Sequence, residues 1–407
     1  MRKILFIALA LTALAVHSYA QEFSEFTDNN ARKLTLGGDN NSIQVGGRVS
    51  GYYEFRWLKP GNDNYSHNGW AMKDGDLDVL GRTASKFVYE FHFSLLDLAT
   101  AAATQNTAAP DAPGIKAGYL EYRGWPVRIK FGFDKVPFSQ GSLNDVWASP
   151  MQSHANLYSG DLFSRRDFGI TLNYRTWKER INLYGGVYSG LGENFFEYGN
   201  DASGRFEYIG RAEFSFPGKM KYCSIDEENS AKPQFRIGID GRYEDKRQPA
   251  GQSILTDEPD AIGPYGIKLF DGKRLVYGAD AMLKYKGISA LFEADMMKCQ
   301  PTDPSDLLYA GTPASFNRGY VKAGGIVTGL NYNFEKIHSV FSVQYEHFNT
   351  NDLQQGEQEW MYYGYAYKVD GFNSVFKIEY YKPTLEDHNG SPLKYYQQIR
   401  VGYQVVF

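Results

Sequence analysis

The chain has 407 residues, with 43 Lys and Arg against 47 Asp and Glu, and a formal net charge of −4. This balance leaves no basic excess to attract nucleic acid or an anionic surface. Aromatic residues make up 16% of the chain and 42 residues are Gly, a composition that favours a β-barrel with aromatic girdles and many short turns.

The N-terminus is typical of a secretory leader. Arg2 and Lys3 precede an apolar run from Ile4 to Val16, which is too short to cross about 30 Å of hydrocarbon as a helix. Residues 1–20 are therefore predicted to be a signal peptide that is cleaved after Ala20. Because this leader has two basic residues and no acid, its removal changes the net charge from −4 to −6.

Residues 21–41 are polar and show little strand pattern. Two interpretations remain open for this N-terminal segment. It is either a flexible periplasmic tail or a short extra element for contacts in a trimer.

Strict alternation begins directly afterwards. Between residues 43 and 57, apolar residues such as Ile43, Val45 and Phe55 alternate with polar or small ones, over a length that exceeds the five or six residues of an average soluble strand. The same alternation fills residues 395–407, where one face is mostly apolar and the other mostly polar. This pattern indicates strands with lipid on one side and water on the other.

The chain ends in Phe407, with apolar or aromatic residues two, four and six positions earlier. This ending resembles the terminal signature by which the barrel-assembly machinery recognises outer-membrane barrels. The barrel-assembly machinery is therefore an expected partner.

The same template predicts sixteen strands in the whole chain. Their expected ranges are 42–58, 70–82, 86–96, 115–124, 126–135, 166–176, 179–189, 205–217, 234–246, 273–285, 287–298, 318–333, 337–348, 358–369, 373–383 and 393–407. Long connections follow the odd strands and short ones follow the even strands, except for the long segment 218–233. Residues 42–407 are thus predicted to form an all-β fold, a 16-stranded antiparallel transmembrane β-barrel with short periplasmic turns and long extracellular loops.

Several sequence stretches resemble the phosphate-selective porins O and P. The resemblance covers most of the chain after the leader, and it is carried by Lys130 to Ser139 (KFGFDKVPFS), Arg165 to Gly169 (RRDFG), Tyr208 to Arg211 (YIGR), Tyr277 to Ala281 (YGADA), Leu291 to Asp295 (LFEAD) and Gly319 to Gly324 (GYVKAG). It implies a Gram-negative outer-membrane homotrimer of sixteen-stranded channels, with outer-membrane lipids and lipopolysaccharide as neighbours.

The resemblance also implies that a third loop, Pro137 to Ser164, folds into the lumen and narrows the pore. The alternative is an ordinary extracellular loop. Loop residues expected to meet the solute are Asp145, Gln152, His154, Asn156 and Asp161.

The pore wall is predicted to have a mixed charge. Cations on the inward parity are Arg48, Arg56, Arg128, Lys130, Arg175, Arg211, Arg236, Arg242 and Arg400. A similar number of Asp and Glu residues share that parity, and the loop from Pro137 to Ser164 contains no Lys or Arg. A mixed lining favours a general or weakly selective channel for small hydrophilic solutes or ions, while a phosphate- or anion-selective pore and a pore for another specific solute remain alternatives.

Other classes of function have little support in the sequence. It contains no G-x-S-x-G elbow and no H-E-x-x-H pair, so no enzyme is predicted and no cofactor is implied. Asp74, Asp76 and Asp78 have the spacing of the first ligands of a calcium loop, but Val79 and Ser85 stand where Gly and Glu are needed. The remaining alternatives are a secreted soluble glycan-binding β-protein and a barrel with a structural or adhesive role.

Overall fold

The structure is a computed structural model that describes residues 34–38, 41–59, 66–84, 86–96, 114–155, 157, 163–192, 204–246, 272–302, 320–349, 352, 357–385 and 395–407. Its strands are β1 (Leu34–Gly37), β2 (Ser42–Lys59), β3 (Ser66–Thr83), β4 (Phe87–Ser94), β5 (Ile115–Tyr122), β6 (Val127–Lys135), β7 (Arg166–Thr176), β8 (Ile181–Tyr188), β9 (Glu207–Phe216), β10 (Gln234–Lys246), β11 (Gly272–Tyr285), β12 (Ile288–Pro301), β13 (Val321–Phe334), β14 (Ser339–Asn349), β15 (Gln358–Asp370), β16 (Ser374–Leu385) and β17 (Tyr395–Val406). Short helical segments are α3 (Gln140–Leu143), η1 (Val146–Ala148) and η5 (Glu335–Ile337).

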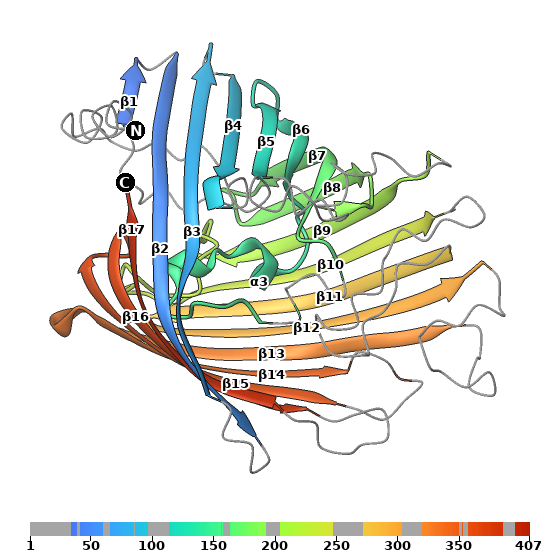
Figure 1. The fold of residues 1–407 in the computed structure, drawn as a ribbon. Helices are drawn as coiled ribbons and strands as arrows, with labels where there is room; N and C mark the ends of the chain where they lie inside the picture. The colour runs from blue at the N-terminus through green and yellow to red at the C-terminus, as the bar shows by residue number, and fades with distance from the viewer. Residues whose placement is uncertain are drawn as a thin grey trace, which may run out of the picture.

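Strands β2 to β17 form a closed antiparallel barrel of sixteen strands (Figure 1). Each strand pairs with its neighbours in the chain, and β17 closes the ring by pairing with β2. At this seam Gly47 and Phe407 exchange two backbone hydrogen bonds of 2.8 and 2.9 Å. The predicted sixteen-stranded barrel is confirmed, and its strand boundaries differ from the predicted ones by a few residues at the ends.

The strand β1 was not predicted from the sequence. It pairs antiparallel with residues 42–45 of β2, whereas β17 pairs with residues 48–59 of β2. Four residues are too few to show a periodic pattern. We interpret β1 as covering the part of β2 that extends beyond β17, where an uncovered edge would leave backbone groups unpaired.

The alternation places apolar side chains on the outside of the barrel and polar ones inside. On β10, Ile237 and Ile239 are 51% and 64% exposed, whereas Arg236 is 1% exposed. Large apolar side chains are exposed in the same way on the other strands of the barrel, and such a surface is stable only in a hydrocarbon environment. Across the residues that the structure describes, no helix is long and apolar enough to cross a membrane.

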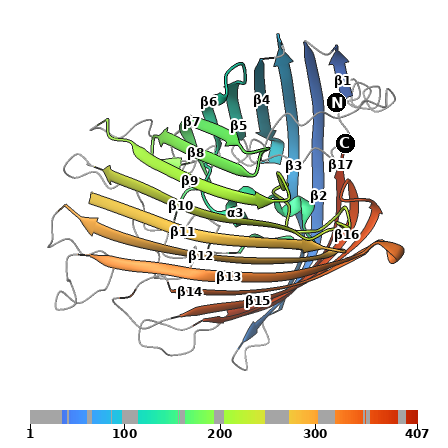
Figure 2. The ribbon, with the colours of Figure 1, turned by 180° about the vertical axis from the view of Figure 1, so that it is seen from behind.

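One end of the barrel has short turns. Six of its seven connections have two to four residues. Between β11 and β12, for example, Lys286 and Gly287 both have positive φ, 49° and 81°, as a tight hairpin turn requires. The strand ends that the long connections join lie at the other end of the barrel, as the sequence pattern predicts (Figure 2).

The seventh connection, residues 217–233, folds back into the barrel, and we call it the inward turn. Its Ser224 carbonyl accepts hydrogen bonds from Ser289 Oγ on β12 (2.7 Å) and Asn331 Nδ2 on β13 (2.9 Å). Its Ile225 packs in one buried cluster with residues of β14 to β17, including Val340 and Val406. The inward turn therefore starts between β9 and β10 and reaches across the interior to the other side of the barrel.

Candidate pore constriction

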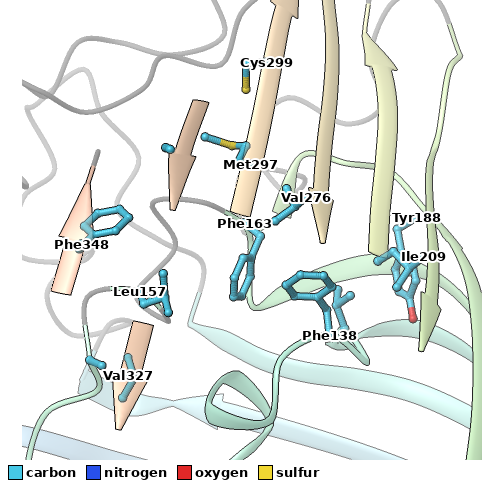
Figure 3. Close-up of a cluster of buried hydrophobic side chains, with 13 residues drawn as sticks. Phe138, Leu157, Phe163, Tyr188, Ile209, Val276, Met297, Cys299, Val327 and Phe348 are labelled. Atoms are coloured by element: carbon cyan, nitrogen blue, oxygen red, sulfur yellow. The ribbon is translucent and has the colours of Figure 1, made fainter. Parts of the chain in front are cut away.

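The segment between β6 and β7 has its described residues, 136–155, 157 and 163–165, inside the barrel, and we call these residues the inward loop. Its Phe138, Leu157 and Phe163 are fully buried and pack against wall residues such as Ile209 and Val327 (Figure 3). Figure 1 shows α3, which belongs to this loop, within the ring of strands. The inward folding of the third loop is thus confirmed for its described residues.

Acidic side chains of the wall hold the backbone of the inward loop. Gly141 N donates to Glu293 on β12 (2.8 Å), and Gln152 N and Ser153 N donate to Glu379 on β16 (2.7 and 3.0 Å). Each bond satisfies a buried backbone N–H that no strand pairs, and bonds to a charged acceptor are stronger than neutral ones. These wall carboxylates therefore serve to fix the loop.

The inward loop also meets the inward turn and the opposite wall. Lys377 Nζ on β16 donates to the carbonyls of Val146 (3.2 Å) and Trp147 (3.0 Å). Cys223 of the inward turn lies with its sulfur 3.7 Å from the carbonyl oxygen of Ala148. The two segments together narrow the lumen from both ends.

Burial divides the inner wall into two halves. On β9 and β10 the predicted wall residues Arg211, Arg236 and Arg242 are only 1–3% exposed, because the inward loop and the inward turn cover them. On the half from β2 to β8, the side chains of Arg48 (14%) and Arg56 (35%) remain partly exposed. Among the predicted wall cations, those with partly exposed side chains therefore lie mainly on β2 to β8, together with Arg400 on β17 (17%).

The predicted constriction residues are only partly described. Asp145 is half-buried and accepts an ion-pair hydrogen bond from Lys135 Nζ (2.7 Å). Gln152 is buried and donates to the carbonyl of Arg400 (3.3 Å), while His154 is half-buried. Asn156 and Asp161 lie outside the described residues.

Most predicted wall cations form ion pairs. The pairs are Arg48 with Asp74 and Asp76, Arg56 and Arg400 with Glu54, Lys130 with Asp134, Arg175 with Glu179, Arg211 with Glu213, Asp240 and Asp280, and Arg242 with Glu207. Arg236 instead donates to Gln140 Oε1 and the Met220 carbonyl. Arg128 faces inward and is half-buried.

Two further lumenal cations, Lys73 and Lys116, escaped the sequence analysis. Each lies at a β-bulge, on β3 beside Met72 and on β5 beside Ala117, where the pairing register shifts by one residue. Alternation assigns such a side chain to the outside of the barrel, but a bulge reverses its face and turns it toward the inside. Lys116 Nζ pairs with Asp76 (3.0 Å), and Lys73 interacts through its charge with Asp74, Glu379, Arg48 and Arg400.

Loop residues at the constriction have shifted protonation equilibria. Burial, together with the charges of Arg165 and Lys73, keeps the pKa of His154 well below its usual value. Burial by itself would raise the pKa of the Asp145 carboxyl, but the charge and hydrogen bond of Lys135 outweigh it and lower the pKa to about 2. At neutral pH the loop thus presents an uncharged imidazole to a surrounding of cations.

Three side chains on β3 and β4 lie close enough together to hold a metal ion. Asp78, Glu90 and His92 each place a ligand atom within 4.8 Å of the others. His92 Nδ1 lies 3.2 Å from an oxygen of Asp78 and Nε2 lies 3.3 Å from an oxygen of Asp76. Carboxylates of β3 thus lie beside both ring nitrogens.

No protein-family model matches the chain, and no curated protein matches it. Several solved structures match the chain. The anion-selective porin from Comamonas acidovorans superposes with a TM-score of 0.56 at 11% identity, over 90% of this chain and 100% of that chain. OmpT of Vibrio cholerae gives a TM-score of 0.55 at 9% identity, over 92% and 100% of the two chains. The outer-membrane channel DcaP of Acinetobacter baumannii gives 0.52 at 12% identity, over 90% and 98%. The chain therefore has the barrel fold of outer-membrane porins and channels.

Proposed function

We propose that the protein is a passive diffusion channel in a Gram-negative outer membrane, open to small hydrophilic solutes and ions with a weak preference for anions. One observation carries the proposal, namely the unequal burial of charges on the inner wall. Acidic side chains are buried beneath the inward loop, whereas basic side chains on β2 to β8 remain accessible to water.

Acidic side chains of the inner wall are shielded from the water-filled lumen in two ways. Glu293, Glu346 and Glu379 are 0% exposed because the inward loop lies on them. On the accessible half, Glu54 and Asp76 are also buried (6% and 3%) against their arginine partners. Their charges still offset the cations nearby, so the net field is modest and the expected selectivity is weak.

The cations keep their accessibility on the same half. Arg48, Arg56, Lys73, Lys116 and Arg128 are all half-buried rather than buried. Long basic side chains extend their charged ends into water while their stems cover the wall. The carboxylates of Asp78 and Asp134 are half-buried on the same strands. An anion that moves along this wall therefore still meets more accessible positive than negative groups.

Phosphate selectivity is the alternative form of this proposal. It would follow from the sequence resemblance to the phosphate-selective porins O and P, and Arg165 and Arg166 at the end of the inward loop offer cations for it. The paired state of most wall arginines favours the weaker, general preference.

The cellular setting is part of the proposal. Residues 1–20 would direct secretion, Phe407 would present the chain to the barrel-assembly machinery, and lipopolysaccharide and phospholipid would surround the apolar outer face. We assign the protein no catalytic activity, since diffusion through the lumen requires none.

We also propose a homotrimer, because one side of the barrel wall is built from short strands. Strands β4 and β5 have eight residues each, which at about 3.3 Å per residue and a tilt of about 45° cover about 19 Å, less than about 30 Å of hydrocarbon. This wall carries exposed Phe91, Leu120 and Phe131. A neighbouring copy would cover the aromatic side chains and avoid thinning the bilayer.

The decisive experiment is single-channel recording of the refolded protein in a planar bilayer, with the reversal potential measured under a salt gradient and phosphate added in steps. We expect stepwise conductance, a small anion preference and no saturating block by phosphate. Strong anion preference with saturating block would support the phosphate-selective form instead. Absence of conductance would overturn the channel function and favour a structural barrel. Stability in buffer without detergent would favour a soluble protein instead.

A further inference from the structure

The wall beneath the start of the inward loop holds two adjacent rows of residues that cross β9 to β12. In the first row Arg211, Asp240, Gly278 and Asp295 pair in register across the four strands. In the second row Glu213, Gly238, Asp280 and Glu293 pair in the same way. Each row thus contains one glycine between residues with charged side chains.

Each glycine provides room for charged side chains of its neighbours: Gly238 for the guanidinium of Arg211 and the carboxylate of Asp280, and Gly278 for two carboxylates. A Cβ on Gly278 would lie 2.0 Å from Asp295 Oδ1 and 2.9 Å from Asp240 Oδ1. The two carboxylates therefore lean toward each other over Gly278. Their oxygen atoms occupy the space that the side chain of any larger residue at position 278 would need.

One carboxylate oxygen of Asp240, of Asp280 and of Glu293 is already engaged. Asp240 Oδ2 accepts from Ser139 N (2.8 Å) and from Arg211, Asp280 Oδ2 accepts from Arg211 (2.6 Å), and Glu293 Oε2 accepts from Gly141 N (2.8 Å). These bonds fix the position of the carboxylates. They also join the beginning of the inward loop to the wall.

Among the described residues no N–H or O–H donor with a fixed hydrogen reaches the other oxygens, which are Asp240 Oδ1, Asp280 Oδ1, Glu293 Oε1 and both oxygens of Asp295. The carboxyls of Asp295 and Glu293 lie within hydrogen-bonding distance of each other, which a shared proton would allow. Glu293 and Asp295 are 0% exposed, so water at the protein surface does not satisfy them. A buried polar atom without a partner is costly, and a buried carboxylate is more so.

The charges of this group do not balance. Glu213, Asp240, Asp280, Glu293 and Asp295 surround Arg211, which pairs with three of them, and the carboxylate of Asp295 faces those of Glu293, Asp240 and Asp280. Several like charges in a buried site require either bound protons or a bound cation.

We propose that this group binds a hard divalent cation, with Ca²⁺ as the probe ion, through the unengaged oxygens of Asp240, Glu293 and Asp295. Calcium takes six to eight oxygen ligands in variable geometry, and water completes the set beside these carboxylates. The cation offsets the excess negative charge, and it locks the Ser139 to Gly141 segment of the inward loop against the wall.

The test uses the full mature chain, refolded without lipopolysaccharide and freed of metal with a chelator. Bound calcium per chain is measured by elemental analysis after equilibration with about 1 mM Ca²⁺, and the unfolding midpoint is compared in Ca²⁺ and in chelator. The variants are Asp295→Asn, Gly278→Ala and Asp134→Asn. Asp134 is a matched control because it is a lumenal carboxylate outside the proposed site, and it pairs with Lys130 on the same strand, β6.

We expect one tightly bound Ca²⁺ in the wild type and in Asp134→Asn, with a raised unfolding midpoint, and loss of both effects in Asp295→Asn and Gly278→Ala. If the wild type retains no calcium and its unfolding midpoint is the same in Ca²⁺ and in chelator, bound protons neutralise the group and the proposal is wrong. Calcium retained by both site variants would place the ion elsewhere and overturn the assignment. The channel function is measured separately, so a conducting pore without calcium contradicts the cation site alone.

Discussion

Glu379 on β16 accepts the backbone N–H of Gln152 at 2.7 Å and thereby fixes the middle of the inward loop to the wall. The same carboxylate accepts the N–H of Ser153 at 3.0 Å and lies 3.6 Å from Arg400. An acid that the sequence pattern assigns to the pore lining is thus a structural support of the constriction.

Replacing Glu379 with Ala should loosen the inward loop. The N–H groups of Gln152 and Ser153 lose their acceptor, at a cost of about 1–3 kcal/mol. We expect a lower free energy of unfolding in urea and a noisier open-channel current. Glu359→Ala, whose side chain is 49% exposed, is the control, and equal effects in the two variants would contradict the anchoring role.

Lys73→Gln should weaken the anion preference. Lys73 is half-buried at a bulge and interacts with Arg48 and Arg400 at the inner wall. A unit charge about 4 Å from a passing ion in water is worth about 1 kcal/mol, so the anion-to-cation permeability ratio should fall by up to about fivefold. Reversal potentials check this, with the exposed Lys232→Gln as the control; an unchanged ratio in Lys73→Gln would place Lys73 away from the ion path.

Shortening the inward turn should widen the channel. Deletion of residues 220–230, with two glycines joining Lys219 to Ala231, removes the segment that crosses the interior to reach Asn331. Conductance should rise by a factor of about two, because access resistance at this end falls. Ile225→Ala keeps the turn but removes buried contacts (1% exposed), so it should mainly cost about 2–5 kcal/mol of stability. A deletion variant that folds and conducts like the wild type would contradict the narrowing role.

The low pKa of His154 predicts a specific pH dependence. The folded protein keeps His154 neutral because burial and the charges of Arg165 and Lys73 oppose its protonation, whereas the unfolded chain protonates it near pH 6.5. The unfolded state then binds the extra proton, so this contribution is present above about pH 6.5 and is lost as the pH falls below it. The free energy of unfolding of the wild type should therefore drop more between about pH 7.5 and 5.5 than that of His154→Gln. Parallel curves would show that His154 has an ordinary pKa.

Phe407→Ala should impair assembly in cells more than folding in the test tube. The backbone bonds between residue 407 and Gly47 do not depend on the side chain, which is 47% exposed. Refolding into detergent should be nearly unchanged, while the amount of barrel in the outer membrane falls. The measurement compares the amount of heat-modifiable barrel on gels for the refolded protein and for outer membranes from cells. An equal loss of barrel in the two samples would assign the aromatic ring of Phe407 a role in packing.

The barrel itself could be predicted from the sequence. Alternation is local, because each strand has one face toward lipid and one toward the interior, and it is therefore visible in the chain without knowledge of the fold. The strand number, the long and short connections and the inward position of Arg48, Asp240 or Glu379 all follow from it. Its failures are local as well: Lys73 and Lys116 lie at bulges, where a single additional residue reverses the face.

The tertiary structure alone decided which inward residues meet water. Parity places Arg56 and Arg242 on the same face of the wall, but one side chain is 35% exposed and the other 1%. The difference arises from two segments without periodicity, the inward loop and the inward turn, whose positions depend on contacts between residues far apart in the chain, such as Cys223 with Ala148. Such contacts leave no repeating signal in the sequence, because any buried residue of suitable size and polarity can make them.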